Sequence, residues 1–191
     1  MAYIGGIVTG FYLFASAPGI HKKKKWQHLT GWDYAHRGLY DNEHGIPENS
    51  MAAFRRAVDK GYGIELDVHL TADNQLVVFH DDTLTRMCGM NKKISSFLYS
   101  DLMQLRLLGT EEGIPLFKDV LELIDGKVPL IIELKVDGSN QNLLCPLVWQ
   151  LLSRYKGDYC IESFHPFVLQ WFKRHEPQVV RGQLSCTFFK E

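Results

Sequence analysis

Two short stretches of this sequence combine the pattern of a buried strand with ionisable side chains. Residues 63–70 (GIELDVHL) and 76–82 (LVVFHDD) are mostly apolar, yet they contain Glu65, Asp67 and His80. Burying a carboxylate is costly unless it is paired or binds a metal. Side chains two apart in a strand point to the same face, so Glu65 and Asp67 can offer oxygen ligands to one hard cation. We therefore expect this pair to form the floor of an active site.

The elements that must position these residues are short strands alternating with amphipathic helices from Gly31 onward. The first helix is expected between a cap at Asn49 or Ser50 and a stop at Gly61. Strands are expected at 32–38, 64–68, 76–80, 128–135, 159–164 and 179–184, and further helices at 116–124, 142–155 and 166–175. Residues 81–118 are irregular, with one helical pattern near 101–108, which predicts a lid or small insertion.

Polar residues end most of the predicted strands, and this pattern distinguishes between two parallel architectures. His36, His80, Glu133 with Lys135, and Glu162 with Ser163 all lie near carboxyl ends. Catalytic groups drawn from the ends of many strands are typical of a (β/α)8 TIM barrel, whereas an open doubly wound sheet gathers them at one switch point. The sequence therefore predicts an α/β barrel of TIM type, truncated after about six strands and occupying residues 31–191.

The first 26 residues have a different composition. Residues 1–20 contain no charged side chain, and four consecutive lysines follow at 22–25. A segment of this length and character is expected to be a membrane anchor, and the lysines place the folded domain on the cytoplasmic face. A cleaved signal peptide and a loosely packed soluble extension are the alternatives. Residues 1–26 are thus a possible membrane contact of a protein that is otherwise cytoplasmic.

Composition limits the remaining classes of function. The 191 residues are 46% hydrophobic and 23% charged, which suits one globular domain with a substantial core. A formal net charge of −1 argues against general nucleic-acid binding, which favours a basic surface. The cysteines show no C-x-x-C spacing and are expected to be reduced thiols, mostly buried. They are Cys88, Cys145, Cys160 and Cys186.

Five motifs together resemble the glycerophosphodiester phosphodiesterase family, within the superfamily of phospholipase C-like phosphodiesterases. The resemblance covers roughly residues 34–183 and leaves the N-terminal segment unexplained. Members of this family close their barrel with two more strands, which this sequence lacks. The motifs are His36-Arg37-Gly38, Pro47-Glu48-Asn49-Ser50, Glu65-Leu66-Asp67-Val68, Val77-Val78-Phe79-His80-Asp81 and Glu133-Leu134-Lys135.

The resemblance implies a role for each matching residue. Three carboxylates bind a divalent cation, calcium or magnesium, and two histidines act as the general acid and base. Two basic residues contact the phosphate, and a further acid lies close to the glycerol end of the substrate. The metal ligands are Glu65, Asp67 and Glu133; the catalytic histidines are His36 and His80; the substrate-binding residues are Arg37, Glu48 and Lys135.

The chemistry of the side chains agrees with these roles. A dication with Arg37 and Lys135 stabilises the charge that grows on a phosphodiester in the transition state, and two imidazoles can divide the proton transfers. The sequence leaves open which histidine is the acid. Glu133 and Lys135 could instead simply neutralise each other. The domain's other histidines are expected to be exposed or structural, namely His44, His69, which is placed beyond the strand end, His165 and His175.

The sequence therefore predicts a metal-dependent hydrolase of lipid metabolism that cleaves glycerophosphodiesters to an alcohol and glycerol 3-phosphate. One alternative is a related phosphodiesterase that acts on lysophospholipid or sphingomyelin, for which an apolar N-terminus would hold the site at a membrane. The other is a noncatalytic, truncated barrel that binds phosphodiesters. The sequence does not indicate an oligomeric state.

Overall fold

The structure is a computed structural model that describes residues 26–185. Its sheet has the strand order β1-β2-β4-β5-β6, and all neighbours along this path are parallel. A helix lies between each strand of this path and the next, as in the wall of a (β/α)8 barrel, although β1 and β6 do not pair with each other within 26–185. These parallel strands are β1 (Tyr34–His36), β2 (Gly63–Leu70), β4 (Leu130–Leu134), β5 (Tyr159–Ser163) and β6 (Val180–Gln183).

The sixth strand of the sheet is a hairpin arm and not part of the barrel wall. All six predicted strands are present, but β3 (Leu76–Val78) is antiparallel to the end of β2. The turn between β2 and β3 is far too short for the crossover that a parallel pair needs. Counting this strand toward the wall was therefore wrong, and the wall has five strands where the sequence suggested six.

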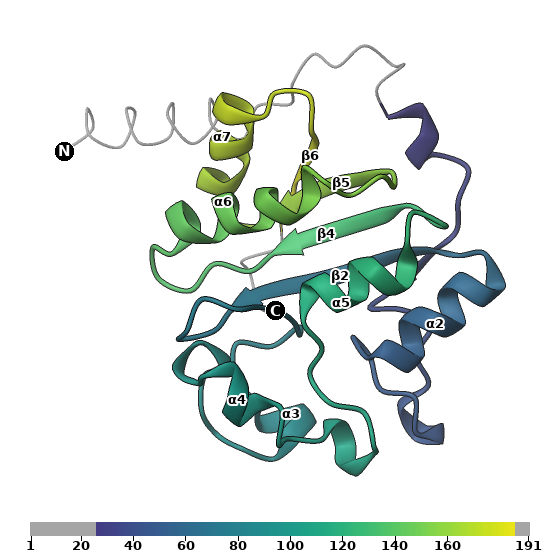
Figure 1. Ribbon diagram of the computed structural model, residues 1–191, viewed down its shortest axis with the longest axis vertical. Coiled ribbons are helices and arrows are strands. Elements are labelled where there is room, and N and C mark those ends of the chain that lie inside the picture. Colours follow the sequence, from purple (N-terminus) through teal and green to yellow (C-terminus); the bar gives the residue numbers. More distant parts are fainter. Residues whose placement is uncertain (1–25, 186–191) are drawn as a thin grey trace, which may run out of the picture.

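Four helices cover one face of the sheet, and Figure 1 shows α5 in front of β2. The first begins at its predicted cap, because the Ser50 hydroxyl accepts a hydrogen bond from the Ala53 N–H, and it ends at Gly61 with a left-handed φ of +72°. Sequence periodicity placed the others to within about three residues. The helices are α2 (Met51–Lys60), α5 (Phe117–Ile124), α6 (Gln141–Leu152) and α7 (Pro166–His175).

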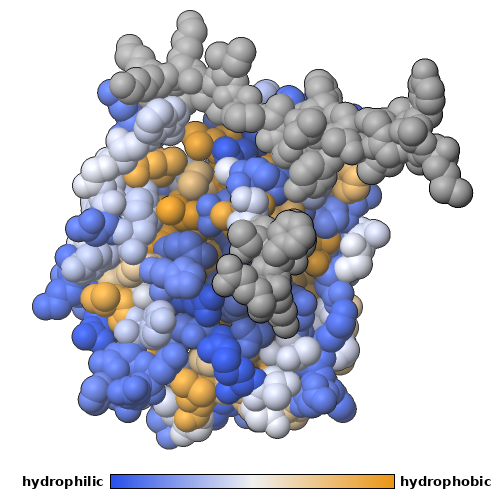
Figure 2. All heavy atoms as spheres, turned by 180° about the vertical axis from the view of Figure 1, so that it is seen from behind, coloured by the Kyte–Doolittle hydropathy of each residue, from blue (hydrophilic) through white to orange (hydrophobic). Residues whose placement is uncertain are grey.

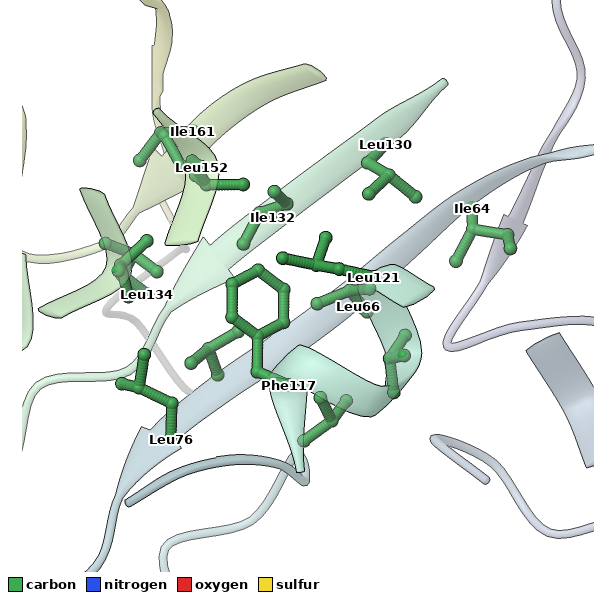
Figure 3. Close-up of a cluster of buried hydrophobic side chains, with 14 of the residues drawn as sticks. Ile64, Leu66, Leu76, Phe117, Leu121, Leu130, Ile132, Leu134, Leu152 and Ile161 are labelled. Carbon is green, nitrogen blue, oxygen red and sulfur yellow. The ribbon is translucent and has the colours of Figure 1, made fainter. Parts of the chain in front are cut away.

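The main core lies between these helices and the sheet. Figure 3 shows Phe117 of α5 lying against the strand face from which Leu66 and Ile132 project. All three side chains are completely buried. Alternate residues of β2 and β4 therefore belong to the core, and the residues between them must face the other side of the sheet. Figure 2 looks onto the side opposite to that of Figure 1, where hydrophobic and hydrophilic surface are both exposed.

Residues 81–116 form a compact insertion with a small core of its own. They contain α3 (Thr85–Cys88), α4 (Tyr99–Leu102) and short 3-10 turns at Ile94–Ser96 and Leu107–Gly109. The helix expected near 101–108 is therefore shorter and begins earlier. Further 3-10 turns lie at Gln27–Leu29 and Asn42–His44. The insertion's buried side chains pack with Val77 and Phe79 of the hairpin, and they are Leu84, Met87, Ile94, Leu102, Leu107 and Ile114.

Two expectations concern the membrane and the cysteines. No helix within residues 26–185 is long and apolar enough to cross a bilayer. The predicted anchor, apart from Trp26, lies outside the described residues.

Cys88, Cys145 and Cys160 are free thiols, and Cys145 is fully buried.

Candidate active site

The face of the sheet opposite the main core carries the predicted carboxylates. Glu65 and Asp67 alternate with the core residues of β2, Asp67 is in register with Glu133 of β4, and Glu133 is in register with Glu162 of β5. One ligand oxygen from each of Glu65, Asp67 and Glu133 lies within 4.8 Å of the others, and all three side chains are buried. The structure thus brings together the three residues expected to bind a cation.

Burial and, after it, the charges of neighbouring carboxylates disfavour the ionised forms within this group. Burial, together with the charge of Asp67, raises the pKa of Glu65 to about 8. Burial and the charges of Glu133 and Asp67 raise the pKa of Glu162 to about 7, and burial raises the pKa of Glu133. Such shifts show that the site lacks positive charge for its carboxylates. A cluster of hard oxygen donors with this property fits calcium or magnesium.

Lys135 supplies part of the positive charge. Its Nζ lies 3.0 Å from Asp67 Oδ1 and 2.8 Å from Glu133 Oε1. Although burial opposes the charged form, Asp67 and Glu133 raise the pKa of Lys135, which keeps the ammonium charged. Glu133 and Lys135 therefore do form an ion pair, which was the alternative that the sequence left open. It does not exclude a phosphate contact, because Lys135 follows the end of β4 at the rim of the same carboxylate group.

Arg37 follows β1 and turns back over the carboxylates. Its φ of +58° is uncommon for a residue with a side chain. In this conformation its N–H donates to Glu65 Oε2 at 2.9 Å, and its NH1 donates to Glu48 Oε1 at 2.8 Å. The buried Nε has no hydrogen-bond partner among the described residues, and Asp67 Oδ2 lies 3.9 Å from it. A buried N–H donor without a partner is suited to donate a hydrogen bond to a phosphate oxygen of a substrate.

The two predicted catalytic histidines come from segments that lie along the same edge of β2, the edge opposite β4. His36 ends β1, is 64% exposed, and places Nε2 3.8 Å from Glu65 Oε2. Burial and the charge of Arg37 lower its pKa. His80 reaches the site because β3 runs back along β2, and the Phe79 N–H donates to the Asp67 carbonyl at 3.0 Å. Its Nδ1 is 2.7 Å from Asp81 Oδ1.

Sequence reasoning missed three residues that hold these groups. Asn49 was expected only as a possible cap, but its Nδ2 donates to Asp67 Oδ2 at 2.9 Å. His69 was placed beyond the end of β2, and this is wrong: it is buried within β2, with Nε2 3.3 Å from the His80 carbonyl. Arg86 of the insertion contacts both Glu48 and Asp81. The alternation of β2 could have identified His69, whereas no local signal points to Arg86.

A cavity of about 330 Å³ opens beside Lys135, between the ends of β4 and β5. Phe164 is 48% exposed and forms part of its wall. The cavity combines charged and apolar surface next to the carboxylates, as a site for a phosphodiester with an organic substituent requires. Its lining residues are Asp82, Glu133, Leu134, Lys135, Val136, Ser163, Phe164 and His165.

Known sequences are similar to this chain. Residues 36–187 match the sequence model of the Glycerophosphoryl diester phosphodiesterase family. A lysophospholipase D of Rattus norvegicus is 34% identical over an alignment of 173 residues, and the match covers 83% of this chain and 52% of that protein. A glycerophosphodiester phosphodiesterase of Caldanaerobacter subterraneus is 34% identical over an alignment of 166 residues, and the match covers 78% of this chain and 65% of that protein. The chain thus spans about half to two thirds of the length of these relatives.

Known structures share the fold. A phosphodiesterase of Oleispira antarctica, solved in complex with the product sn-glycerol-3-phosphate, matches with a TM-score of 0.75 and 26% identity over 83% of this chain and 67% of that chain. A glycerophosphodiester phosphodiesterase of Parabacteroides distasonis matches with a TM-score of 0.68 and 32% identity, over 78% of this chain and 63% of that chain. The predicted fold class is confirmed by these similarities and by the strand order.

Proposed function

The chain belongs to the glycerophosphoryl diester phosphodiesterase family, and from that premise we propose that it hydrolyses glycerophosphodiesters to an alcohol and glycerol 3-phosphate. The observation that carries the proposal is the convergence of Glu65, Asp67 and Glu133 within 4.8 Å, beside Arg37 and Lys135. The Oleispira relative binds sn-glycerol-3-phosphate as its product, which supports this class of substrate.

The charged groups have separate tasks in the proposed reaction. A divalent cation, calcium or magnesium, held by Glu65, Asp67 and Glu133 would neutralise charge on the nonbridging phosphate oxygens. Arg37 directs its Nε, which has no hydrogen-bond partner among the described residues, toward another of these oxygens, and Lys135 adds a point charge.

His36 and His80 divide the proton transfers. One imidazole accepts a proton from the attacking water as the new P–O bond forms, and the other donates a proton to the alkoxide as the old P–O bond breaks. The products are the free alcohol and glycerol 3-phosphate. Glu48 holds Arg37 through a 2.8 Å hydrogen bond, and we place it near the glycerol end of the substrate.

The decisive experiment measures release of glycerol 3-phosphate from glycerophosphocholine with calcium or magnesium present. We expect turnover that EDTA abolishes and metal restores. His80→Ala should lower the turnover by about 100- to 10,000-fold, whereas His44→Ala, which removes an exposed imidazole of the turn Asn42–His44, should leave it unchanged. Binding without turnover, equal in the wild type and His80→Ala, would instead identify a noncatalytic phosphodiester-binding protein.

A second candidate substrate is lysophospholipid. The Rattus relative is a lysophospholipase D, and the exposed Phe164 gives the cavity an apolar wall. If the chain acts on lysophospholipid, kcat/KM for lysophosphatidylcholine should exceed that for glycerophosphocholine, and Phe164→Ser should reduce only the former. Equal values for both substrates would favour the soluble diester.

We also propose that residues 1–26 contact a membrane from the cytoplasmic side. The support is the uncharged sequence of residues 1–20 followed by four lysines. The full chain should then sediment with anionic vesicles, and a variant that lacks residues 1–25 should stay in the supernatant.

A further inference from the structure

Arg86 connects the insertion to both sides of the candidate site. From α3 its NH1 and NH2 donate to the two carboxylate oxygens of Glu48 at 2.9 and 2.7 Å. Its Nε and NH2 donate to the two oxygens of Asp81 at 2.8 and 2.9 Å. The guanidinium therefore forms a paired set of charge-assisted bonds with each carboxylate, a geometry that lysine does not reproduce.

The contact with Asp81 reaches the imidazole of His80. Burial acts to raise the pKa of Asp81, but hydrogen bonds from Arg86 and His80 outweigh it and lower that pKa to about 2. The Asp81 carboxylate is therefore ionised at neutral pH and can only accept hydrogen bonds. Because His80 Nδ1 lies 2.7 Å from Asp81 Oδ1, this nitrogen must carry the proton in the neutral ring, and Nε2 is left free for proton transfer.

The contact with Glu48 reaches Arg37. Glu48 Oε1 accepts from both Arg86 NH2 at 2.7 Å and Arg37 NH1 at 2.8 Å. Burial opposes ionisation of Glu48, yet the bonds from Arg86 and Arg37 lower its pKa. The Glu48 carboxylate is 5% exposed, so its orientation depends on these two guanidinium groups. Arg86 thereby helps to fix the position of the guanidinium that presents the free Nε.

We propose that Arg86 is a positioning residue for the phosphodiesterase reaction, holding His80 through Asp81 and Arg37 through Glu48. The expected effect of Arg86 on turnover rests on the proposed function. The expected effect of Arg86 on the His80 ring does not depend on that function. The contacts favour positioning over folding of the insertion, because Glu48 lies outside the insertion and Asp81 is its first residue, directly after His80. The insertion also has its own apolar core.

Steady-state kinetics test the proposal with three variants and a control. Arg86→Met keeps the length of the side chain and removes every donor, so kcat should fall by about 10- to 100-fold, the usual loss when a supporting partner is removed. Arg86→Lys should recover only part of the kcat that Arg86→Met loses. Asp81→Asn should lower kcat with KM nearly unchanged. The control is Arg106→Met, since Arg106 lies in the same insertion but donates only to backbone carbonyls.

The nitrogen spectrum of the His80 ring provides a readout that needs no turnover. NMR of the neutral His80 imidazole should show a proton on Nδ1 in the wild type and in Arg106→Met. In Arg86→Met it should show a mixture of the two tautomers. If Arg86→Met keeps the wild-type tautomer, or the wild-type kcat per folded molecule, the proposal is overturned. If the wild type shows no turnover while the tautomer shifts as expected, the proposed function fails and the positioning of His80 by Arg86 stands.

Discussion

The two faces of the central sheet are built from the same strands and have opposite chemistry. On β4, Ile132 faces the helices and is completely buried among apolar side chains. Its neighbours Ile131 and Glu133 face the other side, where Glu133 meets further carboxylates and Lys135. Since side chains alternate along a strand, one stretch of five residues contributes both to the core and to the site.

This difference separates stability from function within single strands. The helix-covered face gains free energy from each buried side chain. The opposite face buries carboxylates beside one another, and burial together with the charge of Asp67 raises the pKa of Glu65 to about 8. The fold must therefore offset the cost of the site with the core on the other side of the same sheet. Substitutions on the two faces should act on different measured quantities.

The largest effect is expected from the core side. Ile132→Ala leaves a cavity in a completely buried position and should lower the free energy of unfolding by about 2 to 5 kcal/mol. Urea denaturation measures this loss. The kcat of the molecules that remain folded should change less than twofold. A loss of kcat as large as that of a site variant would show that the two faces do not contribute separately to stability and activity.

Glu65→Gln should have the next largest effect, and its sign should differ between stability and activity. In the wild type the Arg37 N–H donates to Glu65 Oε2 at 2.9 Å. The amide oxygen of glutamine can still accept this hydrogen bond, but the negative charge of the carboxylate is lost. We expect turnover to fall by roughly 100-fold or more because metal binding is weakened. In EDTA the thermal midpoint should rise, since burial of Glu65 beside Asp67 disfavours the carboxylate. A lower midpoint in EDTA would contradict this interpretation.

Ile131→Ala is the matched control on the site face of β4. Ile131 is only half-buried, so the loss of unfolding free energy should be about 1 kcal/mol, well below that of Ile132→Ala. Urea denaturation of the two variants side by side makes the comparison. Equal losses would show that the site face is packed as tightly as the helix-covered face.

The smallest effect is expected at the rim of the site, in acid. The folded-state pKa of Asp81, about 2, lies below its usual value of 3.8. The ionised form therefore stabilises the fold fully above pH 3.8, and this contribution is lost as the pH falls through about 2. Thermal midpoints between pH 5 and 2 should decline less steeply for Asp81→Asn than for the wild type. Asp59→Asn, at an exposed position of α2, should follow the wild type.

Sequence reasoning succeeded where a pattern depends on near neighbours. Apolar periodicity located the helices, and Ser50 and Gly61 marked the ends of α2 as predicted. Spacing by two placed Glu65 and Asp67 on one face, and the motifs identified the family. Such features are local because a side chain's direction in a strand or helix follows from the backbone around it.

Reasoning from the sequence failed where distant segments meet. The direction of β3 was missed, and with it the burial of His69 and the route by which His80 reaches the site. Arg86 was missed because it lies in an irregular segment, 38 residues from Glu48 along the chain. The path of that segment is set by how its own small core packs against the hairpin.

The sequence by itself determined which side chains can be buried, which can bind a cation and which alternate along each strand. Only the tertiary structure decided that the carboxylates of β2 and β4 converge within 4.8 Å, and that Arg86 joins Glu48 to Asp81. The physical reason is that alternation is a property of one strand, whereas convergence requires the register between strands and the packing of an irregular insertion. These are fixed by contacts among residues far apart in the chain.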